Sequence, residues 1–251
     1  MSKITLVTGS SRGLGRNTAL HIAKQGGDVI VTYHSRRDEA NAVVADIEAL
    51  GRRAVALQLD TGEVSSFPAF VERLQRALRE IWQRDRLDHL VNNAGHGEFA
   101  LISDTTESQF DALMKVHVKG VFFLTQALLP LIEDGGRILN LSSGLTRVTL
   151  PGFGAYSAMK GAVEVLSRYL AKELGGRGIT VNTVAPGAIE TDFMGGAVRD
   201  NQDLNKTCAD MTALGRVGVP DDIGPMIASL LSDNNRWVNA QRIELSGGQG
   251  I

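Results

Sequence analysis

Short runs rich in β-branched residues alternate along this chain with longer stretches in which apolar residues recur every three or four positions. The short runs predict seven strands, at residues 4–8, 28–32, 53–58, 89–92, 137–141, 180–185 and 241–245. The longer stretches predict helices, including those at residues 14–25, 38–50, 65–82 and 107–132. Strands separated by helices pair in parallel, because each crossover carries the chain over one face of the sheet. We therefore expect an α/β fold with helices on both faces of a parallel sheet.

No stretch rich in Pro, Gly or Ser and no internal repeat interrupts this alternation, so we predict a single domain over residues 1–251. The longest stretch without clear periodicity is residues 187–213, which contain many Gly, Asp and Asn residues. Segments of that length between regular elements often close over a binding site. We therefore interpret residues 187–213 as a lid over the substrate.

The charge balance and the cysteine content exclude several classes of protein. Lysine and arginine number 26 and aspartate and glutamate 28, which gives a net charge of −2. This balance disfavours nucleic acid as a partner, because binding to a phosphate backbone needs a surplus of basic residues. Cys208 is the only cysteine, which excludes an internal disulfide and a paired-cysteine metal site, and we predict no metal. No secretory signal is recognisable and no apolar run approaches about 20 residues, so we expect a cytoplasmic protein that does not enter the membrane.

A glycine-rich turn joins the first predicted strand to the first predicted helix. Its sequence over residues 8–15 is Thr-Gly-Ser-Ser-Arg-Gly-Leu-Gly. Glycine allows a tight turn and a close approach of the backbone to a pyrophosphate, and the N–H groups that begin a helix attract negative charge. A glycine triplet alone is weak evidence, but the strand before it and the helix after it strengthen the interpretation. Gly9, Gly13 and Gly15 are therefore predicted to hold the pyrophosphate of a dinucleotide.

The residues after the second predicted strand indicate which dinucleotide is preferred. A site for NAD usually has Asp or Glu there to bind the ribose hydroxyls, whereas the 2′-phosphate of NADP needs cations or hydroxyls. Here the strand is followed by His34, Ser35 and Arg36, and Arg12 lies in the glycine turn. The alternative is that Arg36 only begins a solvated helix. We predict NADP in preference to NAD.

Three further residues predict a catalytic site. Tyr156 and Lys160 are four residues apart and so share one face of a predicted helix, while Ser143 follows the fifth predicted strand. An ammonium group beside a tyrosine stabilises the phenolate and so lowers the tyrosine pKa toward neutrality. A serine hydroxyl can donate a hydrogen bond to a substrate carbonyl. The tyrosine–lysine spacing alone is more often structural, but together the three residues predict a site for carbonyl reduction.

These motifs occur with Asn-Asn-Ala-Gly at residues 92–95 and with a sixth strand that ends in Pro-Gly, within residues 182–187. With them, essentially the whole chain resembles the short-chain dehydrogenase/reductase family. The resemblance implies a doubly wound Rossmann fold with a single seven-stranded parallel sheet. It implies that Tyr156 transfers a proton, that Ser143 orients the carbonyl, and that Lys160 holds the nicotinamide ribose and lowers the pKa of the tyrosine.

The resemblance also extends the predicted cofactor site beyond the glycine turn. Asp60 would meet the adenine, residues 93–95 would line the cofactor, and Thr191 would contact the carboxamide side of the nicotinamide. The predicted cofactor-binding residues are Gly9, Ser11, Arg12, Gly13, Leu14, Gly15, His34, Ser35, Arg36, Asp60, Thr61, Asn93, Ala94, Gly95, Tyr156, Lys160, Pro186, Gly187, Ile189 and Thr191. In similar proteins the helices that correspond to residues 107–132 and 156–174 form the subunit interface, so we also expect a homotetramer.

One position departs from the family pattern. His117 stands where similar proteins usually have a catalytic asparagine. A lone histidine is more often structural than catalytic, but this position makes His117 a candidate catalytic residue whose neutral ring continues a water relay from Lys160. We expect His117 to titrate between about pH 5 and 8 and thereby to shift the acid limb of the rate profile.

The leading interpretation is an NADPH-dependent enzyme that transfers hydride to a ketone, or that oxidises a secondary alcohol. A second is a regulator that senses the dinucleotide without catalysis, which would not need Ser143, Tyr156 and Lys160. A sugar-nucleotide epimerase or dehydratase would usually show a different glycine spacing and an added substrate domain. Reductases of acyl-carrier-protein thioesters tend to carry basic residues where this chain has Glu133 and Asp134. Residues 188–213 mix apolar, acidic and basic side chains, which leaves the identity of the small-molecule substrate open.

Overall fold

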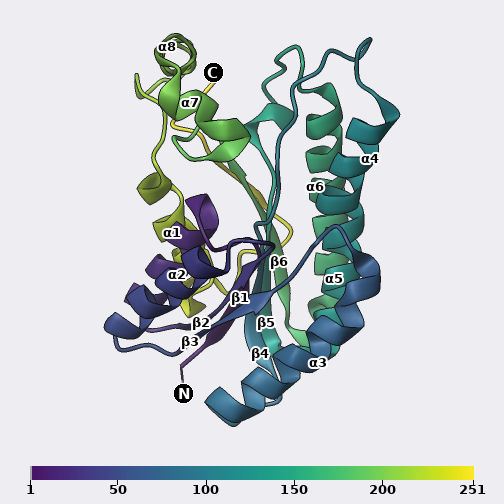
Figure 1. Cartoon of the computed structure of the whole chain (residues 1–251), viewed down its shortest axis with the longest axis vertical. Coiled ribbons are helices and arrows are strands. Elements are labelled where there is room, and N and C mark those ends of the chain that lie inside the picture. The colour runs from purple at the N-terminus through teal and green to yellow at the C-terminus, as the bar shows by residue number, and fades with distance from the viewer. Residues whose placement is uncertain (1) are drawn as a thin grey trace.

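A computed structural model describes residues 2–251. Its strands are β1 (Ile4–Val7), β2 (Asp28–Tyr33), β3 (Ala54–Gln58), β4 (Leu87–Asn92), β5 (Ile132–Leu141), β6 (Thr180–Pro186) and β7 (Arg242–Leu245). They form one sheet, paired in parallel throughout, in the order β3-β2-β1-β4-β5-β6-β7 (Figure 1). The strand order reverses direction between β1 and β4, and open α/β sheets bind ligands in the crevice at such a point. The predicted doubly wound, seven-stranded parallel sheet is confirmed.

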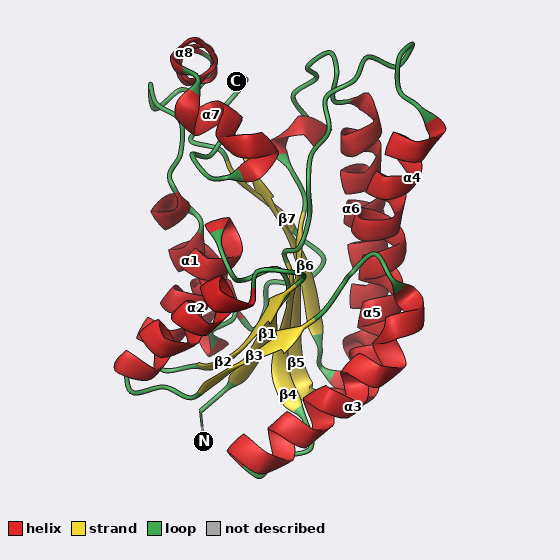
Figure 2. Cartoon of the chain, viewed as in Figure 1, coloured by secondary structure: helices red, strands yellow, loops and turns green. Residues whose placement is uncertain are grey.

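Helices cover both faces of this sheet. They are α1 (Gly13–Lys24), α2 (Arg37–Ala49), α3 (Phe67–Ala77), α4 (Glu107–Met114), α5 (Val121–Leu128), α6 (Gly154–Leu174), α7 (Ala197–Asp200), α8 (Gln202–Asp210) and α9 (Gly224–Leu230). Figure 2 shows α1 and α2 on one face and α3, α5 and α6 on the other. α9 packs against α1, and α4 packs against α6. The molecule therefore has three layers, with the sheet in the middle.

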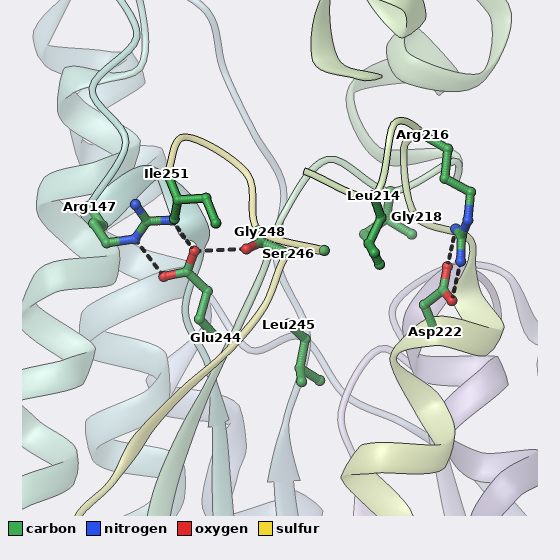
Figure 3. A pocket seen from close by; sticks show the side chains of 12 residues that line it. Arg147, Leu214, Arg216, Gly218, Asp222, Glu244, Leu245, Ser246, Gly248 and Ile251 are labelled. Atoms are coloured by element: carbon green, nitrogen blue, oxygen red, sulfur yellow. Dashed lines mark hydrogen bonds and ion pairs between the residues drawn. The ribbon is translucent and has the colours of Figure 1, made fainter. Parts of the chain in front are cut away.

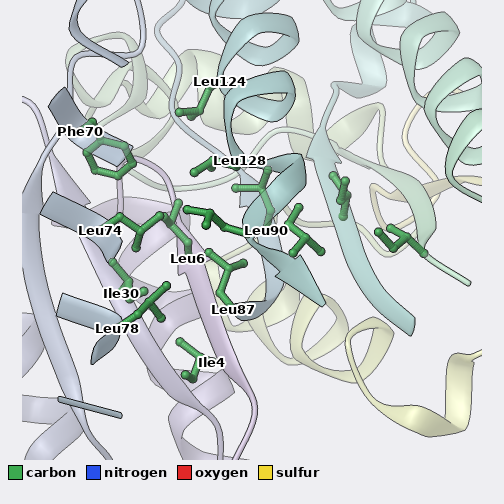
Figure 4. Packing of buried hydrophobic residues seen from close by; sticks show 14 of the residues in the cluster. Ile4, Leu6, Ile30, Phe70, Leu74, Leu78, Leu87, Leu90, Leu124 and Leu128 are labelled. Carbon is green, nitrogen blue, oxygen red and sulfur yellow. The ribbon is translucent and has the colours of Figure 1, made fainter. Parts of the chain in front are cut away.

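Successive side chains of the strands enter two different cores. Leu6 of β1 and Leu90 of β4 join the core on the side of α3 and α5, where they meet Phe70 (Figure 4). Their neighbours Val7 and Val91 join the core on the side of α1 and α2. All five side chains are fully buried, and complete burial of a side chain of this size contributes about 1.5–3 kcal/mol. Because both faces of the sheet are packed, the carboxyl ends of its strands hold the loops of the site in place.

Two predicted helices contain a wider turn. The helix predicted at residues 107–132 is continuous over Glu107–Leu131, but α4 and α5 are joined by a π-helical turn at Lys115–Gly120. α3 likewise continues into a π-helical turn at Leu78–Trp82. A π-helical turn holds more residues than an α-helical turn and frequently lies at a functional site. At Gly120 a Cβ atom would lie 2.1 Å from the Thr61 carbonyl oxygen, so glycine lets the wide turn pack against the loop after β3.

The Glu107–Leu131 stretch corrects the expectation that no apolar run approaches membrane-spanning length. It is 25 residues long and its most apolar 18-residue window has a mean hydropathy of 1.3, so length and composition alone would allow it to cross a membrane. In the structure it packs against α3 and α6 on one face of the sheet. Only 33% of its most apolar window is buried, and Phe122 and Phe123 are among its exposed side chains. The stretch therefore presents an apolar surface that the rest of the chain does not cover.

Residues 187–213 are more regular than the sequence pattern predicts. They contain α7 and α8, which are only 4 and 9 residues long. Elements this short do not complete enough turns for helical periodicity to be recognised. Before them the chain bends sharply at residues 194–196, all three of which have positive φ. The segment therefore contains short helices although its sequence shows no clear periodicity.

Candidate active site

The glycine turn between β1 and α1 combines two left-handed residues with one close contact. Gly9 and Gly13 have φ values of 62° and 56°, a conformation that residues with a Cβ atom rarely adopt. At Gly15 a Cβ atom would lie 2.4 Å from the Gly9 carbonyl oxygen. Glycine at these positions therefore lets α1 begin directly against the end of β1.

The N-terminus of α1 can hold an anion. Its N-cap residue, Arg12, makes no side-chain hydrogen bond to the helix, and the first turn contains no acidic residue. The first N–H groups of a helix carry partial positive charge and lack partners within the helix. Because Gly9, Gly13 and Gly15 also keep this cradle free of Cβ atoms, the residues present fit the pyrophosphate of a dinucleotide.

The loop after β4 is tied to the glycine turn. The Thr8 hydroxyl oxygen accepts hydrogen bonds from the backbone N–H groups of Asn93 and Ala94, both at 2.9 Å. The Asn93 side-chain amide donates to the Thr8 carbonyl oxygen at 2.9 Å. At Gly95 a Cβ atom would lie 2.6 Å from Cε1 of His117. Residues 93–95 therefore connect the nucleotide end of the site to the helix that carries the histidine.

His34 and Asp60 lie side by side beyond the carboxyl ends of β2 and β3. His34 Nε2 is 3.3 Å from Asp60 Oδ2, and both side chains are exposed. Asp60 Oδ1 accepts a hydrogen bond from the Gly62 N–H group at 2.8 Å, which orders the loop that contains Thr61. With Ser35 after β2, these residues occupy the edge of the sheet at which the adenine end of a dinucleotide is predicted.

The two arginines predicted for the 2′-phosphate have carboxylate neighbours. Arg36 Nη1 lies 2.5 Å from Glu39 Oε1, and Arg12 Nη1 lies 3.8 Å from Asp192 Oδ2. Asp192 also accepts a hydrogen bond from Arg199 at 2.5 Å, which lowers the pKa of its carboxyl group. The charge of Asp192 acts on both Arg12 and Arg36, and a phosphate bound by these arginines would have to compete with the carboxylates.

Ser143, Tyr156 and Lys160 converge where β5 ends against the first turns of α6. The Ser143 side chain lies close enough to Tyr156 to lower the pKa of the tyrosine. Lys160 Nζ lies 5.6 Å from the centre of the tyrosine ring and donates a hydrogen bond to the Leu141 carbonyl oxygen at 2.7 Å. All three side chains are largely buried. The structure therefore brings the predicted catalytic residues together in a site that excludes most water.

Burial changes the proton affinities of the tyrosine and the lysine. It raises the pKa of Tyr156 above its ordinary value, and the nearby Ser143 side chain opposes this only in part. Burial lowers the pKa of Lys160 to about 7. The pKa of Tyr156 is thus raised and not brought toward neutrality as predicted, because desolvation of the phenolate outweighs the stabilisation that Lys160 can supply. Near neutral pH Tyr156 keeps its proton, as a donor to a carbonyl oxygen must.

His117 lies in the π-helical turn, edge-on to Tyr156, with 5.3 Å between the ring centres. Its Nε2 lies 2.7 Å from the His96 carbonyl oxygen, so this nitrogen carries the proton and donates it. Its Nδ1 is buried and has no hydrogen-bond partner among residues 2–251. Desolvation, together with the charge of Lys160, lowers the pKa of His117 to about 2. His117 is therefore neutral between about pH 5 and 8, and the prediction that it titrates in that range is wrong.

Residues after β6 cover the catalytic group. The Phe193 ring lies 5.9 Å from the ring of Tyr156, and at Gly97 a Cβ atom would meet the Phe193 ring at 2.6 Å. At Gly13 a Cβ atom would lie 3.9 Å from Cβ of Thr191. Thr191 and Phe193 thus extend from the glycine turn to the catalytic tyrosine.

Comparison with known proteins agrees with this arrangement. A family model described as "Enoyl-(Acyl carrier protein) reductase" matches residues 9–249. An uncharacterised oxidoreductase of Methylorubrum extorquens is 40% identical over 98% of this chain and 97% of its own length. The solved structure of LugOII, described as a promiscuous reductase that catalyses keto-reduction at C1 during lugdunomycin biosynthesis, is 39% identical, with a TM-score of 0.94 over 99% of this chain and 98% of that chain. The angucycline C-6 ketoreductase LanV, solved with bound NADP, is 38% identical, with a TM-score of 0.93 over 98% of this chain and 95% of that chain. The chain belongs to the short-chain dehydrogenase/reductase family.

One predicted cofactor residue of this dehydrogenase/reductase lies against a separate cavity. Pro186 ends β6 and Gly187 follows it beside the Ser143 loop, since a Cβ atom at Gly144 would lie 3.3 Å from the Pro186 carbonyl oxygen. Ile189, by contrast, packs against Gly218 and lines a cavity of about 600 Å³. Figure 3 shows this cavity between two ion pairs. The residues that form these pairs are Arg147 with Glu244 and Arg216 with Asp222.

Three residues that shape the site of this dehydrogenase/reductase were not predicted. Glu39 is three residues after Arg36, and Glu164 is four residues after Lys160, so each spacing on a helix was a visible signal. Asp192 meets Arg12 across 180 residues of sequence, and no local pattern indicates such a contact. Glu164 matters most, because its contacts reach both sides of Ser143.

Proposed function

We propose that this dehydrogenase/reductase is an NADPH-dependent reductase of ketones, with Tyr156 as the proton donor. The observation that carries the proposal is the convergence of Ser143, Tyr156 and Lys160 beside a glycine cradle that fits a dinucleotide. LugOII and LanV, which are keto-reducing relatives, support it. The test is a panel of ketones offered with NADPH or NADH, with consumption of the reduced cofactor measured. Oxidation of NADPH that depends on a ketone is expected, and its absence over a broad panel would contradict the proposal.

In ketone reduction the residues of this chain would have the following roles. When bound, NADPH supplies the hydride. Tyr156, protonated near neutral pH, donates its proton to the carbonyl oxygen as negative charge develops there. Ser143 hydrogen-bonds the same oxygen and Tyr156, which orients the carbonyl. Lys160 holds a ribose hydroxyl and, when protonated, stabilises the phenolate left on Tyr156. The Phe193 ring, which lies beside Tyr156, excludes water from the tyrosine hydroxyl and the carbonyl.

The aromatic side chains near Tyr156 favour a flat, apolar ketone. Phe99 and Phe153 pack edge to face with 5.5 Å between their ring centres, and Phe193 faces Tyr156. The side chains of Phe99 and Phe193 are 61% and 41% exposed, so they can contact a ligand. Aromatic rings stack on flat ligands with little loss of conformational entropy. The panel should therefore include fused-ring aromatic ketones beside linear aliphatic ketones of similar size.

Replacing Arg12 and Arg36 with glutamine is expected to weaken NADPH binding by at least about tenfold and NADH binding by less than about threefold. The reason is that each guanidinium can pair with the 2′-phosphate, which only NADPH carries. Titration of the fluorescence of each reduced cofactor measures both affinities. Arg16→Gln is the matched control, because Arg16 lies on α1 but pairs with Asp46 at the surface. Equal losses for the two cofactors would refute NADP preference through these residues.

His117→Asn is expected to keep activity within about tenfold of wild type and to leave the acid limb of the rate profile unchanged from about pH 5 to 8. His117 is neutral over that range, so its removal takes away no titrating group. The stability profile should change instead. As pH falls below 6.5, the unfolded chain protonates this histidine while the folded chain, with its pKa near 2, does not. Wild type should therefore lose more stability than His117→Asn between about pH 6.5 and 4, as measured by thermal unfolding. A shifted acid limb would show that His117 titrates in the working enzyme.

We also propose that the whole chain is one catalytic domain, that residues 187–213 act as its substrate lid, and that it works as a homotetramer in the cytoplasm. Exposed aromatic residues on the outer helices support subunit contacts, and they are Phe110, Phe122, Phe123 and Tyr169. The free cysteine Cys208 agrees with a reducing compartment. Light scattering tests the assembly, and a mass of one chain in solution would refute the tetramer.

The competing function is a regulator that binds the dinucleotide without turnover. Such a protein would bind NADPH but oxidise none of it in the presence of ketones. The buried cluster of Ser143, Tyr156 and Lys160 favours the enzyme. Burying a lysine and a tyrosine destabilises the folded chain, and a protein that only binds the dinucleotide would gain nothing from it.

A further inference from the structure

Ser143 must stay beside Tyr156 although the two residues belong to different elements. Ser143 follows β5, and Tyr156 lies in the first turn of α6. The chain between them contains a single short helical turn, at Gly144–Thr146. Something outside this loop must therefore hold Ser143 against α6.

The side chain of Glu164 supplies that connection. Its Oε1 accepts a hydrogen bond from the Ser142 hydroxyl at 2.6 Å and lies 2.8 Å from the Thr146 hydroxyl. These two residues flank Ser143 on either side. Glu164 itself lies on α6, eight residues after Tyr156 and four after Lys160, and so on the same face of the helix. One carboxylate thus joins the serine loop to the helix that carries the other two catalytic residues.

The hydroxyl of Thr146 has two possible acceptors but only one hydrogen. It lies 2.9 Å from the Ser143 carbonyl oxygen and 2.8 Å from Glu164. An ionised carboxylate accepts a stronger hydrogen bond than a neutral carbonyl does. Arg242 can satisfy the carbonyl in its place, because its Nη2 lies 3.4 Å from that oxygen.

Arg242 holds Glu164 from the other side. Its Nε donates to Glu164 Oε1 at 2.8 Å, and its Nη1 donates to Glu244 at 2.8 Å. The side chains of Glu164 and Arg242 are 14% and 26% exposed, so solvent screens this pair only partly. Arg242 on β7 therefore fixes the position of the Glu164 carboxylate, and this carboxylate fixes the loop that contains Ser143.

We propose that Glu164 is a positioning residue, which holds the Ser142–Thr146 segment against α6 so that the Ser143 hydroxyl stays beside the Tyr156 hydroxyl. The proposal rests on the proposed carbonyl reduction, since Ser143 acts on the substrate only there. It predicts that loss of Glu164 lowers kcat through Ser143 and leaves NADPH affinity unchanged. A purely structural ion pair would lower stability without any dependence on Ser143.

A double-mutant cycle separates these two roles. We expect Glu164→Ala to lower kcat by about tenfold in the wild-type background and by less than about twofold in the Ser143→Ala background. Glu164→Gln should recover part of the loss, because its amide oxygen still accepts hydrogen bonds. Equal losses in the two backgrounds, or no loss in either, would overturn the proposal. Wild-type enzyme without ketone-dependent NADPH oxidation would contradict the proposed function itself, which is a different result.

Two further variants test whether a loss of kcat comes from misfolding or from any disturbance of the ion pairs. Ser142→Ala combined with Thr146→Val removes the same contacts from the loop side, together with the hydrogen bond that Arg242 Nη2 donates to the Thr146 hydroxyl at 3.0 Å. It leaves the pair of Glu164 and Arg242 intact, so it should show the same dependence on Ser143. Glu244→Gln removes a carboxylate from the same arginine but touches neither Ser142 nor Thr146, and kcat should stay within about twofold of wild type. Thermal unfolding and NADPH titration show that each variant is folded. A loss in Glu244→Gln as large as in Glu164→Ala would assign the effect to Arg242 and refute the specific role of Glu164.

Discussion

Tyr156→Phe is expected to lower ketone turnover by about a thousandfold while NADPH affinity stays within about twofold. Phenylalanine keeps the ring that packs against His117 and Phe193, but it has no proton to donate to the carbonyl oxygen. Single-turnover rates with saturating NADPH and fluorescence titration of the cofactor measure the two effects separately. Tyr169→Phe is the matched control, because Tyr169 lies on the same helix with an exposed side chain. A Tyr156→Phe rate above about one tenth of wild type would remove this residue from the acid role.

Lys160→Met is expected to abolish most activity and yet to make the folded chain more stable near pH 7. The pKa of Lys160 is lowered by burial to about 7 from 10.5. Between those values the unfolded chain binds a proton that the folded chain does not, so wild-type stability rises with pH over that range and is lowest below it. Methionine removes this penalty but leaves the Leu141 carbonyl without its donor, and the net gain at pH 7 should be on the order of 2 kcal/mol.

Thermal unfolding at about pH 7 and 9 measures this effect. The wild-type midpoint should rise relative to that of Lys160→Met as pH increases, while ketone turnover by the variant should fall at least about a hundredfold. Lys172→Met is the control on the same helix, where the side chain is exposed. A Lys160→Met protein that is less stable at pH 7 would show that the ammonium is held by more than the contacts described above.

Local patterns in the sequence predicted most of the fold and several residues that the structure brings together at the candidate site. The alternation of strands and helices was enough for the parallel sheet, and Gly9, Gly13 and Gly15 stand where the backbone needs them. Tyr156, Lys160 and Ser143 could be chosen because their spacing on one helix and at one strand end is a local property. These features are encoded within a few residues of each other or by a repeated period.

Properties that depend on the packed molecule could not be predicted in the same way. The proton affinities of Tyr156 and His117 are set by desolvation, which depends on what the rest of the chain places around them. The approach of Asp192 to Arg12 depends on how the segment after β6 folds back over α1. The contacts by which Glu164 holds the Ser143 loop could not be predicted from the helix spacing alone. They also depend on where β7 places Arg242.

The π-helical turn at Lys115–Gly120 sets the phase between α4 and α5. A π-helical turn winds by less per residue than the roughly 100° of an α-helix, so it absorbs one extra residue and keeps α4 nearly in phase with α5. Leu113 on α4 packs with Tyr156 and Met159, and His117 in the wide turn lies edge-on to the same tyrosine. Deleting one residue of the turn should therefore leave Leu113 against the tyrosine but change which side chain stands at the position of His117.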